Sequence, residues 1–322
     1  MGRRADRLIT HIRTITENDT TNSTTDITDN EILQYINEGQ HRIQSKILAQ
    51  HPRVFIKEKT ITAVQSQEEY SLPADCYLAG RVLSIEYTSE ASSTNPIYHR
   101  LIPASERNRL SHLDGVPTHY IRQDKLNDSG GTFLASPRPS ESDGQFRVRY
   151  VQKIDILDKR RGIVSAVTLN SSTSTITSLT LDTSGTPPID STELDEQDYI
   201  CVVDSLGAIQ MRNIRFTAVS SSTGVVTVGG SFTYESGETI AVGDYIVGGV
   251  NATTHSKLPD SIERYLIQFA AFKMFKRDSS TDSAEQTQEL LALEDEIVNS
   301  YQEIDDDLAD IEIVDNEWMD FY

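Results

Sequence analysis

The sequence holds seven histidines, and their spacing argues against a metal centre. They stand at His11, His41, His51, His99, His112, His119 and His255. No two lie two, three or four residues apart and no HExxH occurs, whereas zinc sites usually combine such closely spaced ligands. The acidic run Asp305 to Asp307 lacks the Asp-x-Asp-x-Asp-Gly spacing of a calcium loop. We expect no metal ion and interpret this run as a solvated helix end, although the sequence alone leaves a cation site there open.

Motifs for nucleotide binding and acyl transfer are also missing. The sequence has no GxxxxGK[ST] phosphate loop, no GxGxxG after an expected strand and no GxSxG elbow for a nucleophilic serine. Cys76 and Cys201 lie far apart without a CxxC partner, so we expect reduced structural thiols rather than a disulfide. A catalytic carboxylate pair could stand anywhere in so acidic a chain, but nothing points to one. We predict that the protein is not an enzyme and binds no cofactor.

The charge is concentrated at the C-terminal end. The 322 residues carry a formal net charge of −20, and no Lys or Arg follows Arg277, whereas 16 Asp and Glu do. A positive groove that grips phosphates cannot be built from such a segment. We therefore expect no specific DNA binding, although DNA could pass close by. No apolar run approaches the roughly 18 residues that a membrane span needs, so we expect no membrane partner.

The acidic tail ends in large apolar side chains. Trp318, Met319, Phe321 and Tyr322 occupy four of the last five positions. One alternative is an end that stays disordered and solvated. We favour a docking segment that becomes ordered on a partner, because a merely solvated tail has little reason to carry these side chains.

Helices are expected at both ends of the chain. Leu8, Ile12 and Ile15 recur at helical spacing over residues 5–15. After a polar loop, Thr28 to Glu31 form a capping box, and the helix that they open ends before Pro52. Near the other end, Asp260 is expected to cap a helix with an aromatic face, and a last helix spans about 284–306. Because neither pair of helices buries its apolar stripe alone, the two ends should pack together.

The middle of the chain reads as strands. Alternation predicts strands at about 55–62, 69–73, 81–87, 118–123, 132–135 and 145–151, with one short helix at 103–110. From about 160 to 253 Ser, Thr, Gly and Val dominate. In this part of the chain, the segment 163–167 resembles 215–219. Likewise, 179–181 resembles 226–228, and 198–200 resembles 244–246. Two similar three-strand units imply a small barrel or sandwich of about six strands, with chance similarity as the alternative.

These elements define an α+β fold. Its terminal helices form a helical bundle, its central section is antiparallel β, and a small β-barrel or sandwich is inserted. We divide the chain into a helix-plus-β body at 1–157, the inserted β domain at 158–253, C-terminal helices completing the body at 254–308, and the acidic, aromatic-ended tail at 309–322.

Three segments resemble head-to-tail adaptor (connector) proteins of tailed bacteriophages. The first is Ile27-Thr-Asp-Asn-Glu-Ile-Leu-Gln-Tyr-Ile-Asn-Glu-Gly-Gln40 after a short helix. The second is Tyr70-Ser-Leu-Pro-Ala-Asp75, and the third runs from Val242-Gly-Asp-Tyr-Ile-Val247 to Lys257-Leu-Pro-Asp260 and a following aromatic-alanine helix. In order, they cover about 1–157 and 254–305. The very acidic C-terminal segment departs from the family pattern.

The resemblance implies a structural virion protein without catalysis or cofactor. It implies a homo-oligomeric ring of twelve copies that joins the capsid portal protein to tail or nozzle proteins in the neck of the virion, after assembly in the host cytoplasm. DNA would pass through without specific binding. The portal would then be the partner of Trp318, Met319, Phe321 and Tyr322, and the inserted domain could meet fibres. The alternatives are another neck or tail ring component, or a carbohydrate-binding or adhesive protein built around the β module.

Overall fold

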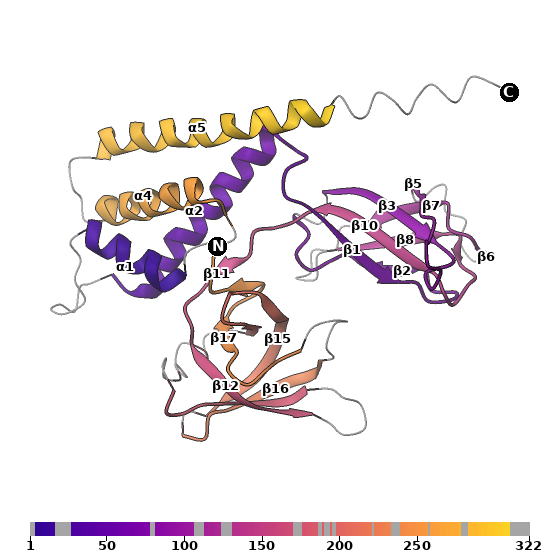
Figure 1. The fold of residues 1–322 in the computed structure, drawn as a ribbon, viewed down its shortest axis with the longest axis horizontal. Helices are drawn as coiled ribbons and strands as arrows, with labels where there is room; N and C mark the ends of the chain where they lie inside the picture. The colour runs from indigo at the N-terminus through magenta and orange to yellow at the C-terminus, as the bar shows by residue number, and fades with distance from the viewer. Residues whose placement is uncertain are drawn as a thin grey trace. The chain divides into compact units, whose positions relative to one another are not determined.

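The structure is a computed structural model, and Figure 1 shows its course from helices through strands back to helices. It describes residues 4–16, 27–77, 81–105, 113–123, 131–169, 176–185, 189, 194, 198–220, 222–232, 239–256, 258–277 and 283–309. The chain divides into two compact units, residues 1–50 with 154–322 and residues 51–153. No helix of the described part is both long and apolar enough to cross a membrane.

The described helices all belong to the first unit. They are α1 (Ala5–Ile15), α2 (Asp29–Gln50), α4 (Asp260–Arg277) and α5 (Ser283–Ala309) (Figure 1). The predicted capping box opens α2: the Glu31 N–H donates to Thr28 Oγ1 at 3.2 Å, and the Thr28 N–H donates to the Glu31 carboxylate at 3.0 Å. The helix ends at Gln50, as the restriction imposed by Pro52 requires.

Helices from opposite ends of the chain share one core. Along one face α2 buries Ile32, Ile36, Ile43 and Ile47, and α4 packs on this helix and on α1. At Gly39 the approach is close, since a Cβ there would lie 3.0 Å from Cδ1 of Phe269. The expected packing of the two chain ends is therefore confirmed. Glycine at this point lets the ring of Phe269 lie against the α2 backbone.

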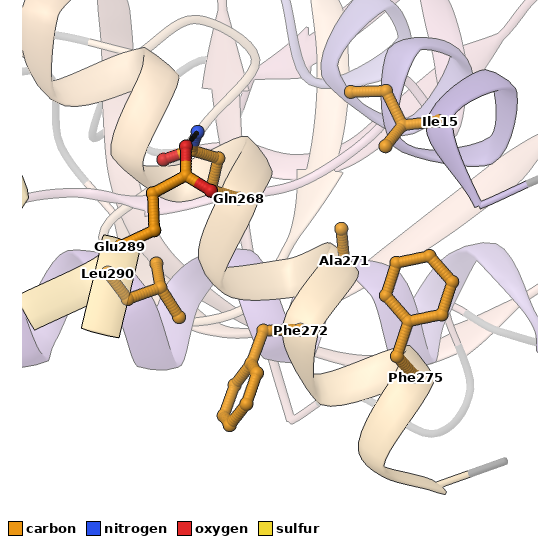
Figure 2. Close-up of a pocket in the computed structure, with 7 residues that line it drawn as sticks. All are labelled: Ile15, Gln268, Ala271, Phe272, Phe275, Glu289 and Leu290. Atoms are coloured by element: carbon orange, nitrogen blue, oxygen red, sulfur yellow. Dashed lines mark hydrogen bonds between the residues drawn. The ribbon is translucent and has the colours of Figure 1, made fainter. Parts of the chain in front are cut away.

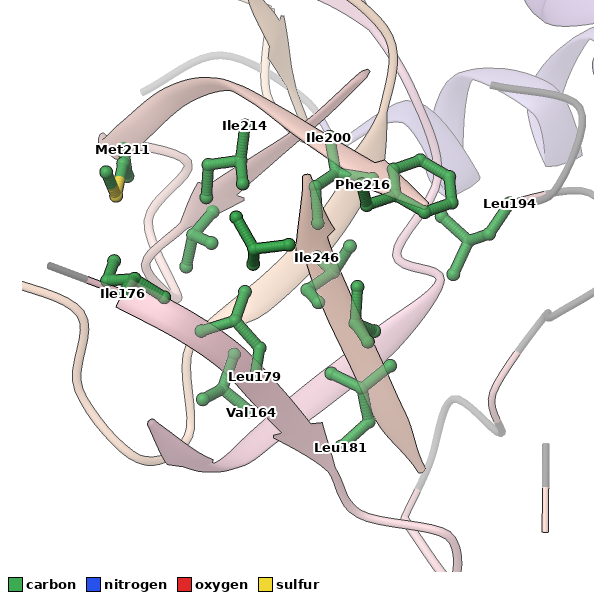
Figure 3. Packing of buried hydrophobic residues seen from close by; sticks show 13 residues of the cluster. Val164, Ile176, Leu179, Leu181, Leu194, Ile200, Met211, Ile214, Phe216 and Ile246 are labelled. Carbon is green, nitrogen blue, oxygen red and sulfur yellow. The ribbon is translucent and has the colours of Figure 1, made fainter. Parts of the chain in front are cut away.

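The inserted segment closes into a six-stranded barrel. Its strands are β12 (Gly162–Leu169), β13 (Ile176–Leu181), β14 (Tyr199–Val203), β15 (Ile209–Val219), β16 (Val225–Phe232) and β17 (Tyr245–Gly248), in the order β12-β13-β16-β15-β14-β17. Branched side chains such as Leu179, Ile200 and Ile246 fill the interior (Figure 3). The barrel is thus a packed core, and the six strands expected from the sequence are confirmed.

The register of the strands confirms the internal repeat. In the first half, β12 and β13 pair Val164 with Leu181, Ala166 with Thr180 and Val167 with Leu179. In the second half, β15 and β16 pair the equivalent residues, Phe216 with Val228, Ala218 with Thr227 and Val219 with Val226. The register shifts at the same point in both halves, after Val164 and after Phe216. The first half consists of β12, β13 and β14, and the second of β15, β16 and β17. If each strand is replaced by its equivalent in the other half, every strand keeps the same neighbours around the barrel, so the barrel has an internal two-fold pattern.

Polar contacts tie the barrel to α2 where the chain enters and leaves it. At this point β11 (Ile156–Leu157) pairs in parallel with β18 (Ala252–Thr253). The side chain of Asn37 in α2 donates to the Leu157 carbonyl at 2.9 Å and accepts the Leu157 N–H at 2.8 Å. Next to it, the buried Arg161 guanidinium contacts Asp158 at 2.6 Å and Asn30 at 3.3 Å. The main-chain groups of Leu157 and the charged guanidinium of Arg161 therefore have hydrogen-bond partners at this junction.

The second unit is built from short strands. They are β1 (Ile56–Thr62), β2 (Glu69–Ser71), β3 (Val82–Thr88), β4 (His99–Arg100), β5 (Ile102–Pro103), β6 (Asp114–Gly115), β7 (His119–Gln123), β8 (Thr132–Ser136), β9 (Arg138–Pro139) and β10 (Gln145–Val151). They form sheets β1-β10-β3-β4, β2-β8-β7-β5 and β6-β9. The core between them is aromatic: Tyr70, Tyr87, Phe133 and Phe146 lie within contact distance of one another in pairs. The strands predicted in this part of the chain are confirmed.

Two local expectations need correction. The helix predicted at 103–110 does not begin there, because Pro103 lies in β5 and the Ala104 N–H donates to the Tyr120 carbonyl at 2.8 Å. Sheet pairing has therefore taken the backbone groups that a helix would use; residues 106–112 lie outside the described part. Asp260 is the first residue of α4 and not its cap, since the Glu263 N–H donates to the Pro259 carbonyl at 3.2 Å. Pro259 holds the capping position.

The shared helical core generates a stability prediction. Phe269→Ala should lower the free energy of unfolding by roughly 3–5 kcal/mol, because it empties the space between α4 and Gly39 of α2. The half-buried Phe272 of the same helix is the matched control, and Phe272→Ala should cost clearly less. Urea titration followed by circular dichroism measures both. Equal losses would show that the buried face of α4 is misassigned.

Candidate interaction site

A buried carboxylate holds α5 against α2 and α4. Glu294 of α5 is fully buried. It contacts Arg42 Nε at 2.7 Å and the Lys46 ammonium, and it accepts a hydrogen bond from the Tyr265 hydroxyl at 2.7 Å. Three elements therefore converge on one side chain, and the position of α5 depends on it.

The protonation of this cluster follows from its contacts. Burial opposes ionisation of Glu294, but the hydrogen bonds from Lys46, Tyr265 and Arg42 outweigh it and lower the pKa of the carboxyl. Burial, reinforced by the hydrogen bond to Glu294, raises the pKa of Tyr265 far above its ordinary value. The phenol thus stays a hydrogen-bond donor, and the cluster is a structural clamp.

Beside the clamp, α1, α4 and α5 enclose an apolar groove of about 220 Å³ (Figure 2). Ala271, Phe272 and Phe275 of α4 form its floor. Leu290 and Glu289 of α5 line one side, and Ile15 of α1 lies across from them. At one end the Gln268 side-chain amide donates to Glu289 at 3.0 Å. This groove is a candidate binding site for an apolar side chain.

Basic residues lie on α1 and α4, two of the three helices that line the groove. Arg7 stands eight residues before Ile15 on the exposed face of α1, and Arg264 stands four residues before Gln268 on α4; both are exposed. Residues four apart lie on the same face of a helix, so Arg264 continues the face of α4 that carries Gln268. Lys276 and Arg277 add positive charge in the last turn of α4. By contrast, α5 contributes nine acids and no base.

The groove contains residues that the sequence suggested only indirectly. The sequence predicts an aromatic face on α4 that packs with the helices from the other end of the chain, yet Phe272 and Phe275 on this face are only half-buried and line the groove. Helical spacing assigns these residues to one face of α4, but it does not show how far along this face α5 packs. The four predicted docking residues, Trp318, Met319, Phe321 and Tyr322, lie outside the described residues.

Groups with reactive potential are held in structural roles. Cys76 and Cys201 are both free and buried, as expected, and burial raises the pKa of the Cys76 thiol to about 12 and also raises that of Cys201. Asp75 accepts hydrogen bonds from the Tyr150 hydroxyl and the Lys57 ammonium, both at 2.7 Å. Among the described residues, no three His, Cys, Asp or Glu side chains are grouped so that they could hold a metal ion.

Residues 3–161 match the model of the SU10 adaptor protein family, a family of phage adaptors. The match spans just under half of the chain; it takes in α1, α2 and the strands β1 to β11 and stops where the barrel begins. No curated protein matches the chain. The expected resemblance to phage adaptors is confirmed at this level. The segments Ile27–Gln40 and Tyr70–Asp75 lie inside the match, whereas the segment from Val242 to Asp260 lies beyond it.

The clamp generates a prediction with a defined pH dependence. Glu294→Gln should lower the free energy of unfolding by roughly 1–2 kcal/mol at pH 7, since it removes charge-assisted hydrogen bonds whose cationic partners, Arg42 and Lys46, are part-exposed. The folded pKa of Glu294 is depressed, so its contribution is present above the unfolded value of about 4.3 and is lost as pH falls through the folded value. The difference between wild type and variant should therefore vanish in acid.

Glu296→Gln is the control, because Glu296 is exposed on the same helix. It should leave stability within about 0.5 kcal/mol of wild type at every pH. Urea titrations at pH 7 and below pH 4 measure both variants. A Glu294→Gln deficit that persists unchanged in acid would contradict the assignment of the clamp to the ionised carboxylate.

Proposed function

We propose that the protein is a structural adaptor of the phage virion that assembles into a ring of twelve copies between the portal protein and the tail. The match of residues 3–161 to a family of phage adaptors carries this proposal. The contacts of the described residues support it, because the charged and nucleophilic groups that are buried serve packing and clamping. In the assembled neck, DNA passes through the ring without specific binding.

The charge distribution supports the conduit role. Residues 278–322 contain 16 acids and no base, so any surface that they form repels the DNA backbone rather than holding it. A repulsive wall suits a channel through which DNA must move. The barrel, residues 158–253 in our division of the chain, is proposed as the part that meets other tail components or fibres.

A carbohydrate-binding or adhesive role finds less support. Such sites usually present exposed aromatic side chains on a shallow face. Among the described residues of the barrel, Phe216 is buried, and Tyr199 and Tyr245 are half-buried. The Arg160 guanidinium covers the ring of Tyr245 at 3.7 Å. These side chains contribute to packing, so we rank this role below that of another neck or tail ring component.

Assembly is tested directly by electron microscopy. The purified full-length protein, in negative stain and by native mass spectrometry, should form closed rings of twelve copies. Phe269→Ala weakens the protomer core, so it shows how a folding defect alone affects the yield of rings. A variant that is impaired in assembly can then be compared with it. A monomer or an open filament at every concentration tested would overturn the ring proposal.

The docking role proposed for Trp318, Met319, Phe321 and Tyr322 has its own test. Truncation after Ala309 should abolish cosedimentation with portal rings, because it removes the aromatic anchors. Binding by the full-length chain should weaken as salt rises, since the tail is acidic and its receptor would be basic. Binding of the truncated protein that equals wild type at low and moderate salt would show that the tail is not the anchor.

A further inference from the structure

The groove between α1, α4 and α5 is left open by the fold. The exposed fraction of Ile15 is 46%, and Phe272 and Phe275 are half-buried. A cavity of roughly 150 Å³ lined by similar side chains is enough to bind a benzene molecule. At about 220 Å³ the groove has room for one aromatic side chain with its flanking backbone.

We infer that this groove receives the C-terminal segment of a second copy of the chain, with Trp318 as the inserted side chain. The inference goes beyond the proposed portal contact: in the assembled adaptor it assigns Trp318 to a neighbouring copy, which leaves Met319, Phe321 and Tyr322 of the tail for the portal. It rests on the proposed assembly of several copies.

The composition of the tail fits the groove. Its 13 residues after Ala309 end in Trp318, Met319, Phe321 and Tyr322, and they also carry five acids. Tryptophan presents the largest apolar surface of the four, roughly 150–250 Å² when buried. Arg264, four residues before Gln268 on α4, is exposed and complements the acids that flank the ring. The apolar ring therefore matches the apolar lining of the groove, and the acids of the tail match the bases of α4 rather than Glu289 on the α5 side.

Chain length disfavours docking of a tail into the groove of its own copy. Leu290 lies 19 residues before the end of α5 at Ala309, which corresponds to about 28 Å of helix. Trp318 stands nine residues after Ala309, a span of about 30 Å when fully extended. The tail could reach its own groove only by running straight back along α5.

The charge of α5 opposes that path as well. The helix carries nine acids and no base, and the tail carries five acids. Laid side by side, they would repel one another. A tail from a second copy can instead approach from the side of α1 and α4, where Arg7, Arg264 and Lys276 are exposed.

Trp318 is the only tryptophan in the chain, so its fluorescence reports directly on the proposed contact. In the assembled wild-type protein, Trp318 emission should lie at shorter wavelength than in the urea-unfolded chain, and acrylamide should quench it less. An emission spectrum equal to that of the unfolded chain in fully assembled protein would overturn the inference.

A matched pair of variants tests the groove. Ile15→Glu places a charge in the groove and repels the acidic tail, and it should return Trp318 emission toward that of the unfolded chain. Leu291 has a similar exposed fraction, 43%, and lies beside Leu290 without lining the groove. Leu291→Glu should therefore leave the emission at the wild-type wavelength. Identical spectra for the two variants would overturn the assignment of the groove.

A mixing experiment separates a second copy from the same copy. Ile15→Glu keeps its tryptophan but has a blocked groove, whereas Trp318→Ala has an open groove and no tryptophan. Refolded together, the two should give emission shifted to shorter wavelength relative to Ile15→Glu refolded alone. Co-assembly without this shift, with native mass spectrometry showing mixed oligomers, would rule out docking between copies.

The same measurements distinguish this inference from the proposed function. Closed rings with an exposed Trp318 would leave the ring proposal standing and remove the groove contact. A protein that stays monomeric, with or without its tail, would remove the assembly on which both rest.

Discussion

The close packing of α2 on α4 is the contact on which the rest of the first unit depends. The two helices are separated by about 210 residues of sequence, and the barrel lies within that separation. Gly39 lets the Phe269 ring reach the α2 backbone, and the buried faces on either side of this contact make one apolar core. The barrel is then held at α2 by its entering segment, at Leu157 and Arg161, and its leaving segment pairs with that segment through β18. Its attachment is made by polar groups of Asn37 and Arg161, so the barrel is placed by hydrogen bonds as well as by packing.

The packed pair of α2 and α4 is also the surface on which α5 is placed. This helix is acidic and buries few apolar side chains, and Glu294 supplies the specific contact to α2 and α4. A carboxylate that is shared by Arg42, Lys46 and Tyr265 fixes the helix in register more sharply than apolar contacts alone would. Because α5 covers only part of α4, the rest of the aromatic face remains open as the groove. The clamp fixes where α5 lies, and the groove is the part of the aromatic face of α4 that α5 then leaves uncovered.

Much of this fold could be predicted from the sequence because local signals agreed with the tertiary structure. The bounds of α1 followed from helical spacing and the start of α2 from the Thr28–Glu31 capping box. The internal repeat was suggested by similar segments, with chance as the alternative, and the strand register decides in its favour. The prediction of a helix at 103–110 was wrong for 103–105, because pairing with β7 outcompeted a weak helical signal. The cap of α4 was shifted by one residue, since Pro259 and Asp260 both suit a helix start. Periodicity could not show that Phe272 and Phe275 line a groove, because exposure there depends on where α5 lies.

We propose that this chain is a structural component of the phage neck, so it should be present in the purified virion. Quantitative mass spectrometry of purified, DNA-filled virions should find the chain together with the portal protein, in a ratio of one copy to one. Absence of the chain from virions, while it is present in the lysate of infected cells, would show that it is not a structural component of the neck.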